Sequence, residues 1–209
     1  MTSILPDATR LGPVRLRVSD GARTASWYQR VLGLVPRPGH AEVVSLGPHE
    51  GETLLELREV PGARPMPARG RVGLYHHALL LPSRADLGAF LEHLRANGEP
   101  FGASDHRFSE AIYLNDPDGL TVEVYADTPR DRWVWERGEV VGAVDPLDAE
   151  SVLAAATGPW RGAPIGTSLG HVHFFVTDLA QAERFHVTGL GFAPVTRRFP
   201  GALFVSAGG

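Results

Sequence analysis

The sequence predicts an α+β protein built from repeated βαβββ modules, whose strands form curved mixed sheets. Three observations lead to this prediction. A unit of one strand and one helix occurs three times, each helix follows a residue suited to capping it and ends at a glycine, and short strands follow the helix in the first two units. Because an internal repeat decides how the whole chain is divided, we settle it before the individual elements.

The third copy of this unit is the clearest one. Residues 169–177 alternate between two faces as a strand does, and a turn at Asp178 and a helix follow. Residues 11–33 form a diverged copy of the same pattern. The corresponding positions are Asp178 with Asp20, Phe185 with Trp27, and Gly191 with Gly33. The two copies differ at one notable position, where the earlier copy has Pro13 and the later copy has His171.

The first module begins with a half-buried strand at residues 14–18, in which apolar and polar side chains alternate. Asp20 follows the strand and is suited to accept hydrogen bonds from the free backbone N–H groups of the next helix. That helix presents a broad apolar face and ends at Gly33. Further strands are expected around residues 34–36, 42–46 and 53–57.

The second module follows a linker at residues 61–70, which is rich in proline and glycine. A strand at residues 75–81 precedes Ser83, which replaces the capping aspartate, and His76 takes the position of Pro13. The remaining expected elements are a helix at residues 84–97, strands at 111–114 and 120–125, and a tight turn at 116–119.

The region after the second module has a different character. Residues 126–166 predict a connector that contains a short helix within residues 145–156, and the third module then ends before its last strand. Because an unpaired inner sheet edge promotes pairing with other chains, we expect the sequence to be incomplete or the module to be completed by another chain, as in a homo-oligomer. The predicted division is an N-terminal domain at residues 1–130 with modules at about 10–60 and 72–126, a connector at 131–166, and an incomplete third module of a C-terminal domain at 167–209.

Composition excludes several classes of function. The chain of 209 residues has a formal net charge of −4, and no cluster of basic residues suggests nucleic acid as a partner. It has no cysteine, which excludes disulfides, thiolate metal sites and cysteine nucleophiles. We see no signal peptide and no apolar run of membrane-spanning length. A membrane partner is therefore not expected, and a cytoplasmic location is expected.

The modules resemble the vicinal oxygen chelate superfamily, which includes glyoxalase I, bleomycin-resistance proteins and extradiol dioxygenases. Motifs at the start and end of modules carry this resemblance, namely His171 with Asp178 and Gly191-Phe192, Asp20 with Trp27-Tyr28 and Leu32-Gly33-Leu34, and Asp116-Pro117-Asp118-Gly119 with Glu123. Within the superfamily the chain is similar to the branch of catechol 2,3-dioxygenase, which has two domains and four modules. The matches to this branch are Tyr75-His76-His77-Ala78, residues 103–106, residues 109–114 and residues 201–209.

This resemblance implies a metal centre. Extradiol enzymes hold Fe(II), or sometimes Mn(II), with two histidines and one glutamate, an arrangement that leaves positions open for substrate and O₂. By resemblance the working site belongs to the C-terminal pair of modules, and His171 falls on its first histidine. The other histidine and the glutamate would come from a fourth module that this sequence does not contain.

The N-terminal pair of modules keeps part of a second ligand set. By resemblance His76 lies on a first-strand ligand position and Glu123 on the last-strand carboxylate position, whereas Pro13 replaces the third ligand. Glu56 is a possible substitute for that ligand. Such a set suits weak binding of Zn(II), Ni(II) or Fe(II), although the N-terminal domain in two-domain extradiol enzymes is usually a structural relic without metal.

Several other histidines match no ligand position or have a simpler role. His77 is adjacent to His76 and must face the opposite side of the strand, and His173 shares the face of His171 but matches no ligand position. His106 could act as an acid–base group or could order its loop through a hydrogen bond, and the second role is the simpler interpretation. His186 is expected on a helix surface. Trp133 and Trp135 are expected to pack within the connector.

The predicted function is therefore that of a non-haem, metal-dependent extradiol dioxygenase, with a small catechol-type aromatic and O₂ as substrates and this chain as a partial form. No catalytic residue beyond the metal ligands is assigned. One alternative is a metal-free protein of the same fold that sequesters an aromatic or drug-like ligand. Another is a lyase or isomerase of the glyoxalase type.

Overall fold

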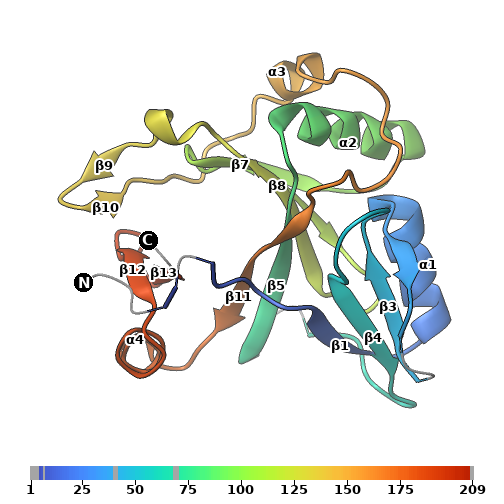
Figure 1. Cartoon of the computed structure of the whole chain (residues 1–209), viewed down its shortest axis with the longest axis horizontal. Helices are drawn as coiled ribbons and strands as arrows, with labels where there is room; N and C mark the ends of the chain where they lie inside the picture. The colour runs from blue at the N-terminus through green and yellow to red at the C-terminus, as the bar shows by residue number, and fades with distance from the viewer. Residues whose placement is uncertain (1–4, 7, 40–41, 68–70, 208–209) are drawn as a thin grey trace.

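Helices packed on mixed β-sheets make up the chain, as a computed structural model shows (Figure 1). The structure describes residues 5–6, 8–39, 42–67 and 71–207. Both complete modules follow the order βαβββ along the chain. The prediction of an α+β protein with repeated modules is confirmed.

The first module forms a four-stranded sheet with one helix. In chain order its elements are β1 (Val14–Val18), α1 (Gly21–Leu32), β2 (Val35–Arg37), β3 (Val44–Gly47) and β4 (Leu55–Glu59). The strand order is β1-β4-β3-β2, with β1 and β4 parallel and the other pairs antiparallel. The Asp20 carboxylate accepts a hydrogen bond from the backbone N–H of Arg23 and so caps α1, and Gly33 ends the helix with a φ of 63°.

The second module repeats this plan. Its elements are β5 (Gly73–Leu80), α2 (Arg84–Asn97), β6 (Gly102–Asp105), β7 (Ser109–Asn115) and β8 (Thr121–Asp127). Ser83 caps α2, and the bounds of this helix agree with the sequence prediction. The sequence does not predict β6, because its residues Gly-Ala-Ser-Asp have no β-branched or aromatic side chain to indicate a strand.

The first strand of the third module, β11 (Ser168–Phe175), lies in the sheet of the second module. It pairs antiparallel with β5, so that the strand order of this sheet is β11-β5-β8-β7-β6. Figure 1 shows β11 alongside β5. The sequence does not predict this pairing, because alternation defines the two faces of a strand but not its neighbours. The division into domains at residues 130 and 166 stays a prediction.

Shorter elements make up the connector and the rest of the third module. They are η1 (Arg130–Arg132), β9 (Trp135–Glu136), β10 (Glu139–Val140), α3 (Ala149–Ala154), α4 (Leu179–Glu183), the π-helix η2 (Arg184–Gly189), β12 (Ala193–Thr196) and β13 (Phe204–Ser206). The strands β9 and β10 form a hairpin, and β12 and β13 form a separate two-stranded sheet. An ion pair of 2.5 Å between Arg198 and Glu136 connects the segment after β12 to the hairpin.

One hydrophobic core extends through the first two modules. Tyr28 of α1 and Phe90 of α2 are fully buried in it, together with Leu55, Leu79 and Ile112 from the sheets. The second sheet thus covers the core with one face. Its other face carries Ala78, Ala111 and Tyr125, which form a small separate cluster. This second face is referred to below as the cup face.

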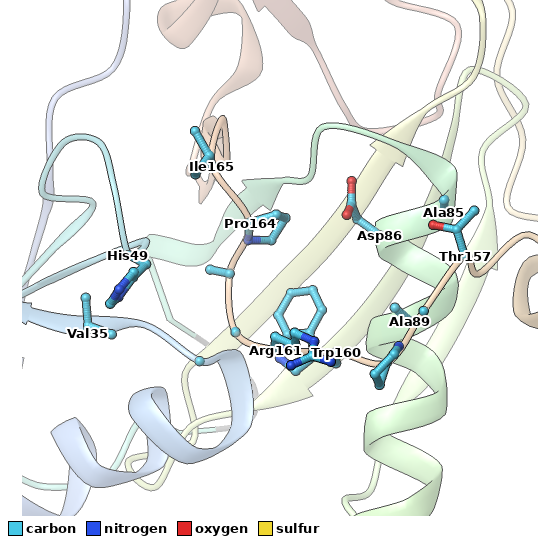
Figure 2. A pocket seen from close by; sticks show the side chains of 15 residues that line it. Val35, His49, Ala85, Asp86, Ala89, Thr157, Trp160, Arg161, Pro164 and Ile165 are labelled. Carbon is cyan, nitrogen blue, oxygen red and sulfur yellow. The ribbon is translucent and has the colours of Figure 1, made fainter.

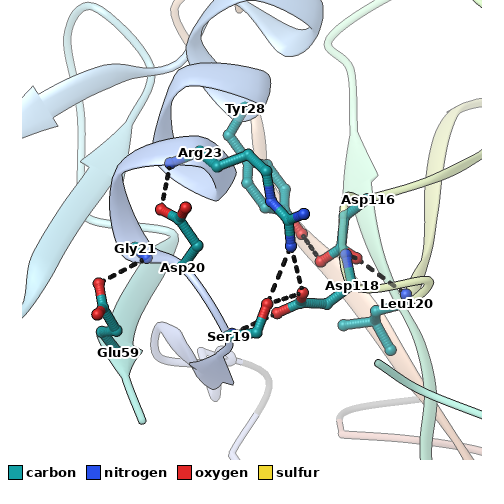
Figure 3. A network of polar contacts seen from close by, with 9 residues as sticks. All are labelled: Ser19, Asp20, Gly21, Arg23, Tyr28, Glu59, Asp116, Asp118 and Leu120. Atoms are coloured by element: carbon teal, nitrogen blue, oxygen red, sulfur yellow. Dashed lines mark hydrogen bonds and ion pairs between the residues drawn. The ribbon is translucent and has the colours of Figure 1, made fainter. Parts of the chain in front are cut away.

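A polar junction joins the first module to the turn that precedes β8 (Figure 3). The backbone N–H of Ser19 donates to Asp118 at 2.6 Å, the Ser19 hydroxyl donates to the same carboxylate, and Arg23 forms an ion pair with it at 2.9 Å. Asp116 accepts hydrogen bonds from the backbone N–H groups of Asp118 and Leu120, which shapes the turn. The start of β8 is therefore fixed against α1.

No helix within the described ranges is long and apolar enough to cross a membrane.

Replacing Asp118 with alanine tests the junction. We expect the free energy of unfolding to fall by about 2 kcal/mol, because the change leaves the Ser19 backbone N–H without its charged acceptor. Equilibrium urea unfolding measures this loss. As the control, Glu42→Ala removes an ion pair of 3.5 Å between exposed side chains and should change stability by less than about 0.5 kcal/mol. Equal losses in the two variants would contradict the role given to Asp118.

Candidate metal centre

Three potential metal ligands converge on the cup face of the second sheet. His76 lies on β5, Glu123 on β8 and His171 on β11. The Nε2 atoms of both histidines lie 3.0 and 3.1 Å from Glu123 Oε2, and 3.2 Å from each other. The His76 and Glu123 side chains are 6% and 4% exposed, whereas that of His171 is 41% exposed. The cluster therefore has a buried base and an accessible side.

Strand register explains how these side chains meet. His171, Ala78 and Glu123 are direct neighbours in one row across β11, β5 and β8. The middle residue of this row is an alanine, so His171 and Glu123 can approach each other above it. His76 lies two residues before Ala78 and therefore on the same face of β5.

Two β-bulges bracket this part of the β5–β11 pair. Leu169 opposes Leu79 but His171 opposes Ala78, so Gly170 is an extra residue in β11. Further along, His173 opposes His76 and Phe174 opposes Leu74, so Tyr75 is an extra residue in β5. The two histidines lie within the short paired segment between these bulges, and Glu123 lies on the neighbouring strand β8.

The structure corrects one part of the sequence analysis. The sequence places His171 in a site of its own and leaves His76 and Glu123 as the remains of another. In the structure all three ligand atoms lie within 4.8 Å of one another. The reason is the antiparallel pairing of β11 with β5, which no sequence pattern indicates. Their role as metal ligands stays a prediction.

The charge of Glu123 is stabilised by its neighbours. Burial alone would raise the pKa of this carboxyl group, but hydrogen bonds from His171 and His76 outweigh burial and lower the pKa to about 2. The cluster thus combines a carboxylate with two histidine rings, which are the residue types of the facial triad in non-haem iron sites.

The spacing of the three donor atoms fits a metal ion. Ligands at about 2.1 Å from an ion, on one face of an octahedron, lie about 3.0 Å apart. Protons cannot satisfy the same three contacts. If both histidines donate to Glu123, two N–H groups face each other, and if one histidine donates to the other, two acceptors face each other. A cation facing three lone pairs satisfies all of them.

Aromatic side chains form one wall beside the cluster. The rings of Tyr75 and Phe175 stack with centroids 4.4 Å apart, and the His173 ring lies 4.8 Å from that of His76. Burial, together with His76 and His171, lowers the pKa of His173 to about 4. His173 thus faces the site as a neutral ring outside the group of three ligand atoms. The bulge explains why Tyr75 shares the face of its neighbour His76, which strict alternation forbids.

A hydrogen-bonded pair lies on the opposite side of Glu123. The His106 Nε2 atom is 2.7 Å from the Tyr113 hydroxyl, and the His106 Nδ1 atom is 2.8 Å from the carbonyl oxygen of Ala143. Burial and contact with Glu123 raise the pKa of Tyr113, so its hydroxyl keeps its proton. Tyr113 is the neighbour of Glu123 across β7 and β8. No pattern in the sequence indicates a role for Tyr113, and only the strand register places it beside Glu123.

The remaining candidates lie away from the cluster. Glu56 pairs with Arg15 at 2.5 Å on the first sheet and is not among the side chains that converge on His76. His77 is fully buried on the core face, as alternation predicts, with its Nε2 atom 3.5 Å from the Tyr28 hydroxyl. The Nδ1 atom of His186 contacts the carbonyl oxygen of Ala182 at 2.8 Å. Trp133 and Trp135 stack on each other at 6.3 Å within the connector.

A hollow of about 420 Å³ lies elsewhere, between α2, the segment after α1 and residues 157–165 of the connector (Figure 2). Its polar side chains include His49, Asp86 and Arg161. None of the three clustered ligands lines it. The hollow is therefore separate from the candidate metal centre.

Comparisons with known proteins agree with this architecture. Residues 10–124 match the family model of the Glyoxalase/Bleomycin resistance protein/Dioxygenase superfamily. A solved structure from Bacillus subtilis subsp. subtilis str. 168 superposes with a TM-score of 0.63 at 13% identity, covering 96% of this chain and 60% of the other. A glyoxalase/dioxygenase from Nostoc punctiforme gives a TM-score of 0.51 at 19% identity, covering 62% of this chain and 99% of the other. At these identities the likeness concerns the fold.

The chain therefore belongs to the glyoxalase/bleomycin resistance protein/dioxygenase superfamily, as its sequence motifs indicate. Within it, the whole chain aligns with a protein named Catechol-2,3-dioxygenase from Bacillus subtilis (strain 168). The two are 40% identical over 216 aligned positions, which cover 74% of that relative.

The buried His77 predicts a dependence of stability on pH. Burial and the nearby His76 lower the pKa of His77 to about 3. The unfolded chain takes up a proton at this residue below about pH 6.5, whereas the folded chain stays neutral there. In chelator-treated protein, His77 should therefore make the free energy of unfolding fall with decreasing pH, by at most about 1.4 kcal/mol per pH unit.

Urea unfolding between pH 7 and pH 5 measures this slope, and the His77→Phe variant removes the contribution of His77. We expect a shallower slope in the variant, whatever its stability at pH 7. Identical slopes for the two proteins would show that His77 takes up its proton in the folded chain as readily as in the unfolded chain.

Proposed function

We propose that this protein is a non-haem, metal-dependent extradiol dioxygenase that cleaves the ring of catechol-type aromatics. The observation that carries the proposal is the group of two histidines and one glutamate with donor atoms 3.0 to 3.2 Å apart. The 40% identity to a protein named Catechol-2,3-dioxygenase supports the same reaction class. Fe(II) is the proposed ion, and Mn(II) or another divalent metal is the alternative.

His76, His171 and Glu123 would hold the ion on one side and leave the opposite side open. When bound there, a ferrous ion supplies Lewis acidity toward two adjacent hydroxyl groups and electrons toward O₂. The reaction adds both atoms of O₂ to the substrate while one ring carbon–carbon bond breaks, so no external reductant is needed.

The walls of the cup suit a flat aromatic ring. Tyr75, His173 and Phe175 offer aromatic surface on one side of the ligands. Ala78 and Ala111 are small, apolar and buried on the same face. These features would orient a planar substrate by stacking and limit the access of water to its ring.

Tyr113 and His106 are placed to handle protons beside the ligands. The carbonyl oxygen of Ala143 can only accept, so His106 Nδ1 carries a proton and donates it to this oxygen. His106 Nε2 can then accept a proton through the Tyr113 hydroxyl at 2.7 Å. A catechol hydroxyl must lose a proton when it binds a metal, and this pair provides an acceptor.

Anaerobic loading with Fe(II) tests the proposed reaction. We expect one ion per chain, consumption of O₂ with catechol, and a yellow ring-fission product. His171→Ala and Glu123→Ala should each abolish turnover and weaken binding of the ion, because two ligands do not complete the triad. The readouts are metal analysis, an oxygen electrode and absorbance of the product.

The control variant is His49→Ala, which removes an exposed histidine outside the cluster and should leave both measurements unchanged. A chain that binds no ion yet binds aromatic compounds would overturn the proposal in favour of a sequestering protein. Metal binding with isomerase or lyase activity, but without O₂ consumption, would favour the glyoxalase type of reaction.

A second test concerns Tyr113. Replacing it with phenylalanine removes the hydroxyl that lies 2.7 Å from His106 Nε2, so turnover should fall by about 100-fold. Binding of the ion should change little, because the three ligands are untouched. Steady-state kinetics and metal titration separate the two effects. An unchanged kcat would exclude a role of the pair in proton transfer.

A further inference from the structure

We propose that Tyr125 is a positioning residue, which acts with Gly170 to set the register of β11 and thereby turns His171 into the cluster. The inference takes from the proposed function only that His171 is a metal ligand. Tyr125 contributes no atom to the group of three ligands. Its role is to fix the strand that carries one of them.

The register change at Gly170 decides where His171 points. Leu169 opposes Leu79 and belongs to the core, whereas His171 opposes Ala78 and faces the cup. In a regular strand these two residues would share a face, because side chains repeat every second position. The extra residue Gly170 reverses the alternation. Without the bulge, His171 would follow Leu169 toward the core face and leave the other two ligands.

At this bulge the ring of Tyr125 leaves no room for a side chain at position 170. A Cβ atom there would lie 1.9 Å from the Tyr125 hydroxyl oxygen and 2.7 Å from Cζ of the same ring. Gly170 is not among the glycines with positive φ, so its backbone conformation is open to other residues. A larger residue at 170 therefore fits only if the Tyr125 ring shifts.

The position of Tyr125 is fixed by burial and by its neighbours in the sheet. It is 7% exposed on β8, where it lies between Leu80 of β5 and Ala111 of β7. Its ring centroid is 5.1 Å from that of His171. One side chain thus contacts the bulge and the imidazole that follows it. A shift of β11 along β5 would move the backbone at Gly170 away from this ring, and a larger residue at 170 would displace the ring itself.

The test introduces the clash and then relieves it. Gly170→Ala should weaken Co(II) binding, followed by the visible spectrum of the bound ion, by about 10-fold to 100-fold, the usual loss when a residue supporting a ligand is changed. Tyr125→Phe removes only the hydroxyl and should have a smaller effect. In the double variant the added methyl group meets the ring without its oxygen, so affinity should recover part of the loss.

A second readout does not depend on the metal. In chelator-treated protein, backbone amides of residues 169–173 should exchange hydrogen faster in Gly170→Ala than in the wild type, and protection should partly return in the double variant. The matched control is Gly102→Ala, a strand glycine in the same sheet whose added Cβ would approach only one atom, at 4.0 Å. It should leave affinity and exchange unchanged.

The outcomes separate this inference from the proposed function. Failure of the wild type to bind Co(II) would overturn the metal centre, while the exchange measurement would still decide whether Tyr125 and Gly170 set the register. The positioning role would be overturned if Gly170→Ala had the same Co(II) affinity and the same amide exchange rates as the wild type. The positioning role would also be overturned if Gly170→Ala and the double variant lost the same amount of Co(II) affinity and amide protection. The effect of Gly170→Ala would then not depend on Tyr125.

Discussion

The antiparallel pairing of β11 with β5 is the constraint on which the candidate site depends. It brings a strand of the third module into the sheet of the second and places His171 opposite Ala78. The same row continues from Ala78 on β5 to Glu123 on β8 and Tyr113 on β7. Ala78, a small residue, therefore has one candidate ligand on each side, His171 and Glu123. Glu123 therefore lies in the interior of the sheet, and His76, two residues before Ala78, completes the cluster around it.

The sequence predicts the elements of the molecule much better than their neighbours. Hydrophobic alternation, the capping residues Asp20 and Ser83 and the terminal glycines locate both long helices, because these signals are local. His76 and His171 were identifiable as candidates from the repeat. The contact between them could not be predicted, because it depends on the order of the strands in the sheet. The roles of Gly170 and Tyr75 could not be predicted either, because they depend on bulges that the sequence does not mark.

The first module stands outside the candidate site but is not independent of it. Its equivalent of the ligand position is Pro13, and its last-strand carboxylate Glu56 is engaged by Arg15. The module instead contacts β5 through the Tyr28 hydroxyl, which lies 3.5 Å from His77 Nε2, and holds Asp118, in the turn before β8, through Ser19. A module that keeps the shared plan without ligands can thus serve as the support for the strand that carries Glu123.

The distance along the chain between the two histidines has a consequence for how the protein assembles. His76 and His171 are separated by 95 positions, so their contact closes a long loop at a cost in chain entropy. Non-local pairings of this kind slow folding, because the entropy of loop closure is lost before the contacts form. An ion held by these side chains would bind the closed chain and not its open precursors, and would stabilise it by mass action. Supply of the ion during synthesis would then influence the yield of folded protein as well as its activity.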